Sequence, residues 1–226
     1  MLKSRSEMVR WLADRLTVLA VVWLAAALAI SAFVIWAFFE LIDVVVEGES
    51  LRYDRAVLLW IHSTFPGWLN EPMRIVTALG YYWFVLPLLA AVVFLFYRRG
   101  WKLSAILLSV STGGSILLTT VLKAVFERAR PDLFDSGYHA SFYSFPSGHA
   151  TIAVGFYGML TLILAYRLKG IARWAVAICG TFVVLLIGFS RLYLGVHYPT
   201  DVLAGYLAAL LWLVCVGILY ALWLSI

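Results

Sequence analysis

The stretch VLAGYLAALLWLVCVGILYALWLS, residues 202–225, contains no charged side chain. The nearest charge before it is Asp201. A helix rises about 1.5 Å per residue, so roughly 20 apolar residues cross the ~30 Å hydrocarbon core of a bilayer. This stretch is long enough to span a membrane as one helix. It predicts a chain that folds within a lipid bilayer.

Five more stretches of the same character precede it, and the composition agrees with them. Apolar residues make up 64% of the 226 residues and charged residues 13%, whereas a soluble domain is about half apolar and about a quarter charged. We expect an all-α membrane protein with six transmembrane helices, forming one domain over residues 1–226. The predicted spans are Leu16–Phe39, Ile75–Tyr97, Leu103–Leu122, Ala150–Tyr166, Trp174–Phe189 and Val202–Ser225.

The charges between these spans predict an orientation. The N-terminal tail and the short connections Arg98–Lys102 and Arg167–Arg173 hold ten of the seventeen Lys and Arg residues but only two acidic residues. The positive-inside rule places them in the cytoplasm, with both termini. The first stretch is too long for the core of a cleaved signal peptide and is expected to be a retained anchor.

The long connections fall on the other side and hold all four histidines. They are Glu40–Arg74, Lys123–His149 and Ser190–Asp201. In the first, Asp54 is expected to cap a short amphipathic helix through Ile61 that lies flat at the interface. That helix is either a lid or connector, or a substrate contact. Charges near membrane depth are commonly functional, so an active site is expected at this non-cytoplasmic end.

The sequence also argues against a nucleic-acid-binding protein and against a protein stabilised by zinc or disulfide bonds. The net charge is +5, but the basic residues form no continuous basic stretch, so no nucleic acid partner is expected. Cys179 and Cys215 lie in apolar stretches without a CxxC pattern or neighbouring histidines. Neither a zinc site nor a disulfide framework is indicated.

The first chemically informative cluster is KAVFERARP, residues 123–131. Lys123 and Arg130 are seven residues apart and would share a face of a continuing helix, which Pro131 is expected to end near Arg130. An ammonium and a guanidinium suit a phosphate approached from two directions. A collar of snorkelling basic residues would show the same pattern. Arg128 either contacts a second phosphate or neutralises Glu127.

The second cluster is FPSGH, residues 145–149, directly before the fourth span. Ser147 fits an N-cap position, and Gly148 allows an anion close to the backbone. The amides that open the helix then attract an anion, and His149 in the first turn can reach it. A capped helix start with an incidental histidine would have the same sequence.

The third cluster is SRLYLGVHYPTD, residues 190–201. Pro199 suits the first position of a helix, which places His197 just before the sixth span and Asp201 in its first turn. Asp201 can then accept a hydrogen bond from one imidazole nitrogen of His197 and leave the other free as a nucleophile. Asp201 also suits the positive end of the helix dipole.

Together the clusters supply a phosphate cradle and two histidines that can divide nucleophile and acid roles. The cradle comprises Lys123, Arg130, Ser147 and Arg191 with backbone amides. The remaining histidines, His62 and His139, are expected to be surface residues without a catalytic role, unless they contact a headgroup.

The order Lys-x6-Arg-Pro, Pro-Ser-Gly-His, Ser-Arg-x5-His-x3-Asp within residues 123–201 resembles the signature of the type 2 phosphatidic acid phosphatase family. That family shares its core with vanadium haloperoxidases and bacterial acid phosphatases. The resemblance implies that His197 attacks phosphorus and forms a phosphohistidine, oriented by Asp201, while His149 protonates the leaving lipid oxygen. It also implies a phosphate site and no metal or other cofactor. That site comprises Lys123, Arg130, Ser147, Gly148 and Arg191.

The implied function is a lipid phosphate or lipid diphosphate phosphatase in the inner membrane of a bacterium. Undecaprenyl diphosphate, phosphatidylglycerophosphate and phosphatidic acid are the candidate substrates, and no obligate protein partner is indicated. A lipid phosphotransferase would use the same residues. A non-catalytic lipid-phosphate binder or transporter, or a vanadate-dependent haloperoxidase, would also need an anion cradle of this kind.

Overall fold

The computed structural model describes residues 28–224, and this part of the chain is helical with no strand. A helix over Leu28–Val46 comes first. The later elements are α2 (Leu51–Thr64), η1 (Gly67–Leu69), α3 (Asn70–Ala78), α4 (Tyr82–Arg98), α5 (Lys102–Phe126), α6 (Gly148–Ala153), a π-helical turn (Val154–Gly158), α7 (Met159–Arg167), α8 (Gly170–Tyr193) and α9 (Pro199–Leu224).

Five helices in the described part are long and apolar enough to cross a membrane, and the count is six if α3 and α4 form one bent span. The predicted all-α membrane fold is confirmed at this level. The helix Leu28–Val46 continues past the predicted end of the first span at Phe39. The beginning of that span and the N-terminal basic residues lie outside the described residues.

The second predicted span, Ile75–Tyr97, is broken. α3 and α4 meet at an angle of 48°, with Gly80 at the break. A Cβ at Gly80 would lie 2.6 Å from Ile187 Cγ2 and 3.2 Å from His149 Cβ, so only a glycine lets this backbone approach α6 and α8 so closely. The hydroxyl of Tyr157 donates to the carbonyl of Leu79 at 2.8 Å and satisfies one of the groups freed by the break.

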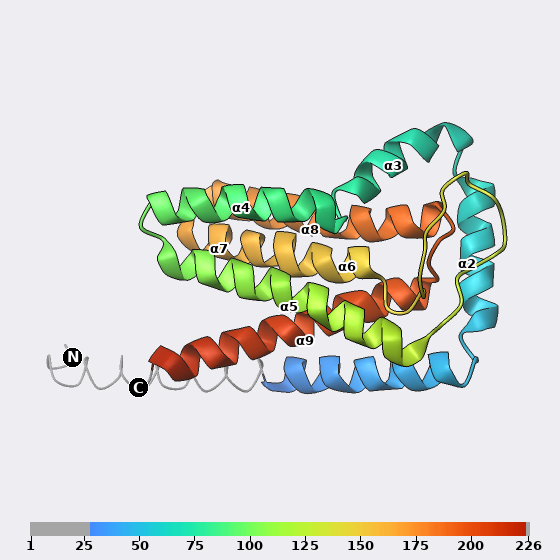
Figure 1. Ribbon diagram of the computed structural model, residues 1–226, viewed down its shortest axis with the longest axis horizontal. Coiled ribbons are helices and arrows are strands. Elements are labelled where there is room, and N and C mark those ends of the chain that lie inside the picture. The colour runs from blue at the N-terminus through green and yellow to red at the C-terminus, as the bar shows by residue number, and fades with distance from the viewer. Residues whose placement is uncertain (1–27, 225–226) are drawn as a thin grey trace, which may run out of the picture.

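α2 lies across one end of the bundle (Figure 1). It begins at Leu51, three residues before the predicted cap, and no side chain caps it. The expectation that Asp54 caps this helix is therefore wrong, because its buried carboxylate is bound to Arg128 and Thr200 instead. The outer face of α2 exposes aromatic side chains such as Tyr53 and Trp60.

Small residues bring α5 close to its neighbours. A side chain at Gly155 would overlap that of Ser115, and one at Gly114 would overlap the ring of Trp212. The hydroxyl of Ser111 donates to the carbonyl of Gly155 at 2.7 Å, directly at the π-helical turn. Small residues at helix contacts are typical of membrane bundles, where close packing stabilises the association.

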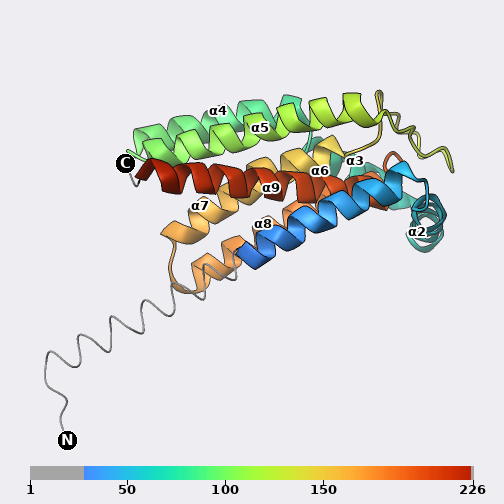
Figure 2. The same cartoon turned by 90° about the horizontal axis from the view of Figure 1, so that it is seen from below.

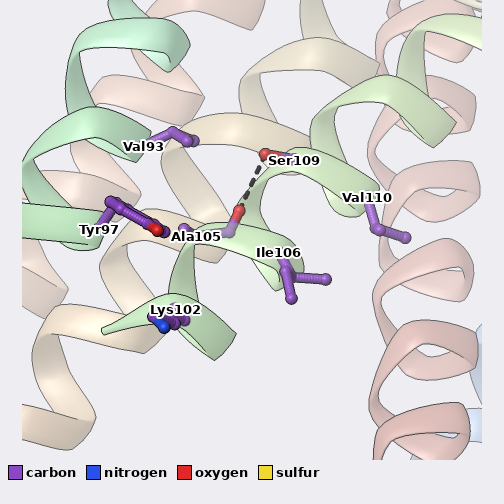
Figure 3. A pocket seen from close by; sticks show the side chains of 7 residues that line it. All are labelled: Val93, Tyr97, Lys102, Ala105, Ile106, Ser109 and Val110. Atoms are coloured by element: carbon purple, nitrogen blue, oxygen red, sulfur yellow. Dashed lines mark hydrogen bonds between the residues drawn. The ribbon is translucent and has the colours of Figure 1, made fainter. Parts of the chain in front are cut away.

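The connections divide between the two ends of the bundle. The short basic connections α4–α5 and α7–α8 lie at one end, and the long segment 127–147 lies at the other, beside α2 (Figures 1 and 2). A groove of about 390 Å³ lies between α4 and α5 (Figure 3). It is far from the signature residues and is lined by Val93, Tyr97, Lys102, Ala105, Ile106, Ser109 and Val110.

Candidate active site

The three sequence clusters meet at the end of the bundle that α2 covers (Figure 1). Lys123 lies in the last turn of α5, and its ammonium donates to the carbonyls of Tyr143 and Ser144 at 2.5 and 3.3 Å. Gly148 lies beside it, since a Cβ there would be 3.8 Å from Lys123 Cε. Segment 127–147 therefore folds back over the end of α5.

The predicted continuous helix from Lys123 to Arg130 is wrong. α5 ends at Phe126, and Glu127 adopts a left-handed conformation with φ of 45°. After this turn Arg128 and Arg130 reach different partners on opposite sides of His197 and Asp201. The helix thus ends five residues before Pro131, so the proline does not mark its end.

Arg130 lies against the imidazole of His197. Its Nη1 is 3.2 Å from His197 Nε2 and donates to the carbonyl of Val196 at 2.7 Å. Its Nε donates to the carbonyl of Phe142 at 2.8 Å. Burial and the nearby charge of Arg191 lower the pKa of Arg130 to about 10, so the guanidinium remains a cation at neutral pH.

Ser147 and His149 occupy the positions that the sequence predicts. Ser147 is the N-cap residue of α6, and His149 lies in the first turn. The Ser147 side chain makes no capping hydrogen bond, although it is completely buried. The Ser147 amide donates to the carbonyl of Asp201 at 2.9 Å and joins the starts of α6 and α9.

Arg191 lies inside the last turn of α8, not in a connection, because that helix continues to Tyr193. Its side chain is 1% exposed, and its Nη1 donates to the hydroxyl of Thr77 at 2.7 Å. The same nitrogen lies 3.4 Å from the hydroxyl of Tyr138, whose ring centroid is 5.3 Å from the Arg191 guanidinium carbon.

His197 and Asp201 lie next to each other, but the predicted hydrogen bond between them is not formed. α9 begins at Pro199, and Asp201 Oδ2 lies 3.4 Å from His197 Nδ1, within ion-pair distance but outside strict hydrogen-bond geometry. The same oxygen accepts the amide of Tyr198 at 2.8 Å. Because Nδ1 faces Asp201, Nε2 is directed toward Arg130.

His197 is neutral in this environment. Burial, followed by the charges of Arg191, Arg130 and Lys123, lowers its pKa well below the ordinary value of 6.5. A neutral imidazole retains the lone pair that a nucleophile needs. Of these cations, Arg130 contacts the imidazole directly, at 3.2 Å from Nε2.

The site concentrates buried polar atoms that have no hydrogen-bond partner. Seven such side-chain atoms occur among the described residues, and four belong to predicted site residues: Ser147 Oγ, His149 Nε2, Arg191 Nε and His197 Nδ1. An unsatisfied buried polar group costs about 1–3 kcal/mol. Of these four atoms, Ser147 Oγ and Arg191 Nε are donors that could bind the acceptor oxygens of a ligand, whereas His197 Nδ1 faces Asp201.

Three further residues at the site carried no sequence signal. Thr77 and Tyr138 contact Arg191, and Tyr81 stacks on His149 with ring centroids 5.6 Å apart. They come from α3, segment 127–147 and the α3–α4 break, whose approach to the site depends on tertiary packing. Of the two histidines expected at the surface, His62 is exposed and stacks on Phe134 at 4.0 Å.

Comparison with known proteins gives a consistent result. The model of the PAP2 superfamily matches residues 104–224. Phosphatidylglycerophosphatase B of Bacillus subtilis is 40% identical over 148 residues, which are 64% of this chain and 71% of that protein. Undecaprenyl-diphosphatase of Sulfolobus acidocaldarius is 33% identical over 144 residues, 62% of this chain and 65% of that one.

A solved structure shares the fold as well. The crystal structure of a transmembrane PAP2-type phosphatidylglycerolphosphate phosphatase from Bacillus subtilis superposes with a TM-score of 0.74 at 34% identity, covering 83% of this chain and 94% of that chain. The family match covers more than half of the residues and contains the whole signature. The chain belongs to the PAP2 superfamily.

Proposed function

We propose that this membrane protein removes phosphate from a lipid phosphate or lipid diphosphate by way of a phosphohistidine on His197. The proposal is supported by unpartnered, buried polar atoms of Ser147, His149 and Arg191 at the same end of the bundle as the buried imidazole of His197. It is also supported by relatives whose names describe phosphatases of phosphatidylglycerophosphate and undecaprenyl diphosphate.

In the first step, His197 Nε2 attacks phosphorus while the bond from phosphorus to the leaving oxygen breaks. Arg130 lies 3.2 Å from Nε2 and is placed to meet the charge on the phosphoryl oxygens. Lys123, Ser147, Gly148 and Arg191 complete the cradle. His149 enters this step as an imidazolium, gives the leaving oxygen a proton from its ring nitrogen and becomes neutral.

In the second step, the now neutral His149 takes a proton from water, and the resulting hydroxide attacks phosphorus. The phosphorus–nitrogen bond breaks and releases phosphate, and His197 returns to its neutral form. Asp201 beside Nδ1 stabilises the positive charge that this ring carries as a phosphohistidine. The two histidines and one water supply every proton that the cycle requires.

The proposed substrate reaches the site from the bilayer. Its apolar tail stays in lipid, while its headgroup meets the cradle at the end of the bundle. The exposed aromatic residues of α2 suit the interface at that end. We propose that this end faces away from the cytoplasm, because the short basic connections lie at the opposite end.

Phosphate release by the purified protein tests this function. The panel consists of phosphatidic acid, phosphatidylglycerophosphate and undecaprenyl diphosphate, with water as the sole acceptor, which also separates a hydrolase from a phosphotransferase. His197→Ala should abolish release. The matched control is His62→Ala, which changes an exposed histidine that stacks on Phe134. Near-full turnover by His197→Ala would exclude the nucleophile assignment.

A further inference from the structure

Arg128 lies behind the catalytic pair and joins two buried carboxylates. Its Nη1 donates to Asp201 Oδ1 at 2.6 Å, and its Nη2 donates to Asp54 Oδ2 at 2.8 Å. Glu127, its neighbour in the sequence, is not among its partners in these hydrogen bonds. The arginine thus connects α2 with the first turn of α9, through residues 74 and 73 positions away.

Asp54 holds the same turn of α9 directly. Its Oδ1 accepts the amide of Thr200 at 3.1 Å, and its Oδ2 accepts the Thr200 hydroxyl at 2.7 Å. The Thr200 hydroxyl also accepts Arg128 Nη1 at 2.8 Å. Ser50 accepts Nη2 at 3.1 Å, so each terminal nitrogen of the guanidinium has two partners.

The burial of these groups makes the arrangement specific to arginine. The side chains of Arg128, Asp54 and Asp201 are 11%, 2% and 0% exposed. The ring of Tyr198 lies 4.4 Å from the guanidinium carbon and covers its face. A planar fork can bind two carboxylates in fixed directions, whereas a lysine ammonium is a point charge on a flexible stem.

The two carboxylate oxygens of Asp201 contact different partners. Oδ1 is held by Arg128, and Oδ2 faces the Tyr198 amide and His197 Nδ1. Fixing Oδ1 fixes the plane of the carboxylate and with it the direction of Oδ2. We infer that Arg128 and Asp54 are positioning residues that orient His197 through Asp201, an inference that rests on the proposed function of His197.

A double-mutant cycle with dioctanoyl phosphatidic acid tests this inference. In the native background, Arg128→Gln should lower kcat about 10- to 100-fold with KM nearly unchanged, because misplacing a reacting group by about 1 Å costs that much. In the Asp201→Asn background the same change should lower kcat less than about twofold, since the route to His197 is already broken. Equal losses in both backgrounds, or an effect mainly on KM, would overturn the inference.

Two further variants keep the test decisive. Asp54→Asn removes one charge but retains a side chain of the same shape, and it should lower kcat less than Arg128→Gln does. Arg55→Gln is the matched control, since this exposed arginine lies next to Asp54 on α2 and should leave kcat unchanged. Thermal unfolding shows whether each variant folds, and Asp54→Asn carries the test if Arg128→Gln does not.

A second readout does not depend on turnover. In a protein labelled with ¹⁵N-histidine, the Nδ1 resonance of His197 should move in Arg128→Gln in the direction that Asp201→Asn moves it, and should stay in place in Arg55→Gln. An unmoved resonance in Arg128→Gln would overturn the inference. If no lipid of the panel is hydrolysed, the proposed function fails, and the resonance still decides whether Arg128 orients His197.

Discussion

Replacing Ser147 by alanine should separate the folding of this protein from its chemistry. Where an N-cap serine makes its capping hydrogen bond, replacing it by alanine lowers the free energy of unfolding of the protein by about 1 kcal/mol. Ser147 makes no such bond, and its hydroxyl is buried without a partner. Removing an unsatisfied group relieves a cost instead of adding one. The free energy of unfolding of Ser147→Ala should therefore equal or exceed that of the native protein.

The effect on turnover should be opposite. A hydrogen bond to a charged group is worth about 1.5–3 kcal/mol. If Ser147 donates to a phosphoryl oxygen in the transition state, kcat/KM should fall by about 10- to 150-fold. The reduction is expected with a lipid phosphate in detergent micelles, measured as phosphate release under identical conditions for both proteins.

Ser111→Ala is the matched control, because this buried hydroxyl donates to the Gly155 carbonyl at 2.7 Å, away from the site. Losing that bond should cost about 1 kcal/mol, a Tm decrease of about 2–4 °C for a chain of this size, with full activity. Thermal unfolding of the two variants is measured side by side. A lower Tm and unchanged kcat/KM for Ser147→Ala would refute the assignment and make Ser147 an ordinary helix cap.

Three other outcomes are expected. His149→Ala should slow a lipid phosphate by about 10²- to 10⁴-fold but an activated aryl phosphate far less, because only the lipid alkoxide needs a proton to leave; equal slowing of both substrates would contradict the acid role. His197 should remain neutral as the pH falls through 6.5, since its pKa is lowered well below that value in the fold. The unfolded chain binds this proton first, so the free energy of unfolding should decrease as the pH falls below about 6.5; His197→Gln should lessen that decrease, and an identical pH dependence in both proteins would argue against it. Prolonged dialysis against EDTA should leave phosphate release intact, whereas a loss that added metal restores would contradict the metal-free mechanism.

The sequence predicts the helices well because lipid imposes a minimum apolar length on each of them. It predicts their ends less well, because contacts between distant residues decide them. α8 continues beyond Phe189 and carries Arg191 into contact with Thr77, and the break around Gly80 follows from close packing against His149. No pattern of neighbouring residues in the sequence predicts these contacts, because they join residues that are far apart along the chain.

The site divides in the same way. Three short motifs predict eight site residues, and the structure brings all eight to one end of the bundle, although their individual roles stay predictions. For Arg128 the sequence suggests a second phosphate or Glu127 as the partner, whereas in the structure this arginine binds Asp54 and Asp201. Asp54 is 74 positions away in another helix. One sequence alone does not show which of its distant charged residues form an ion pair.

The two-residue connection between α7 and α8 has a practical consequence for structure determination. α7 ends at Arg167 and α8 begins at Gly170, at the end of the bundle opposite the site. A rigid helical fusion inserted there would add a fiducial mark to a protein of only 25.3 kDa. The end that holds the candidate site would remain free, so images of the fusion with a substrate analogue would test where the analogue binds.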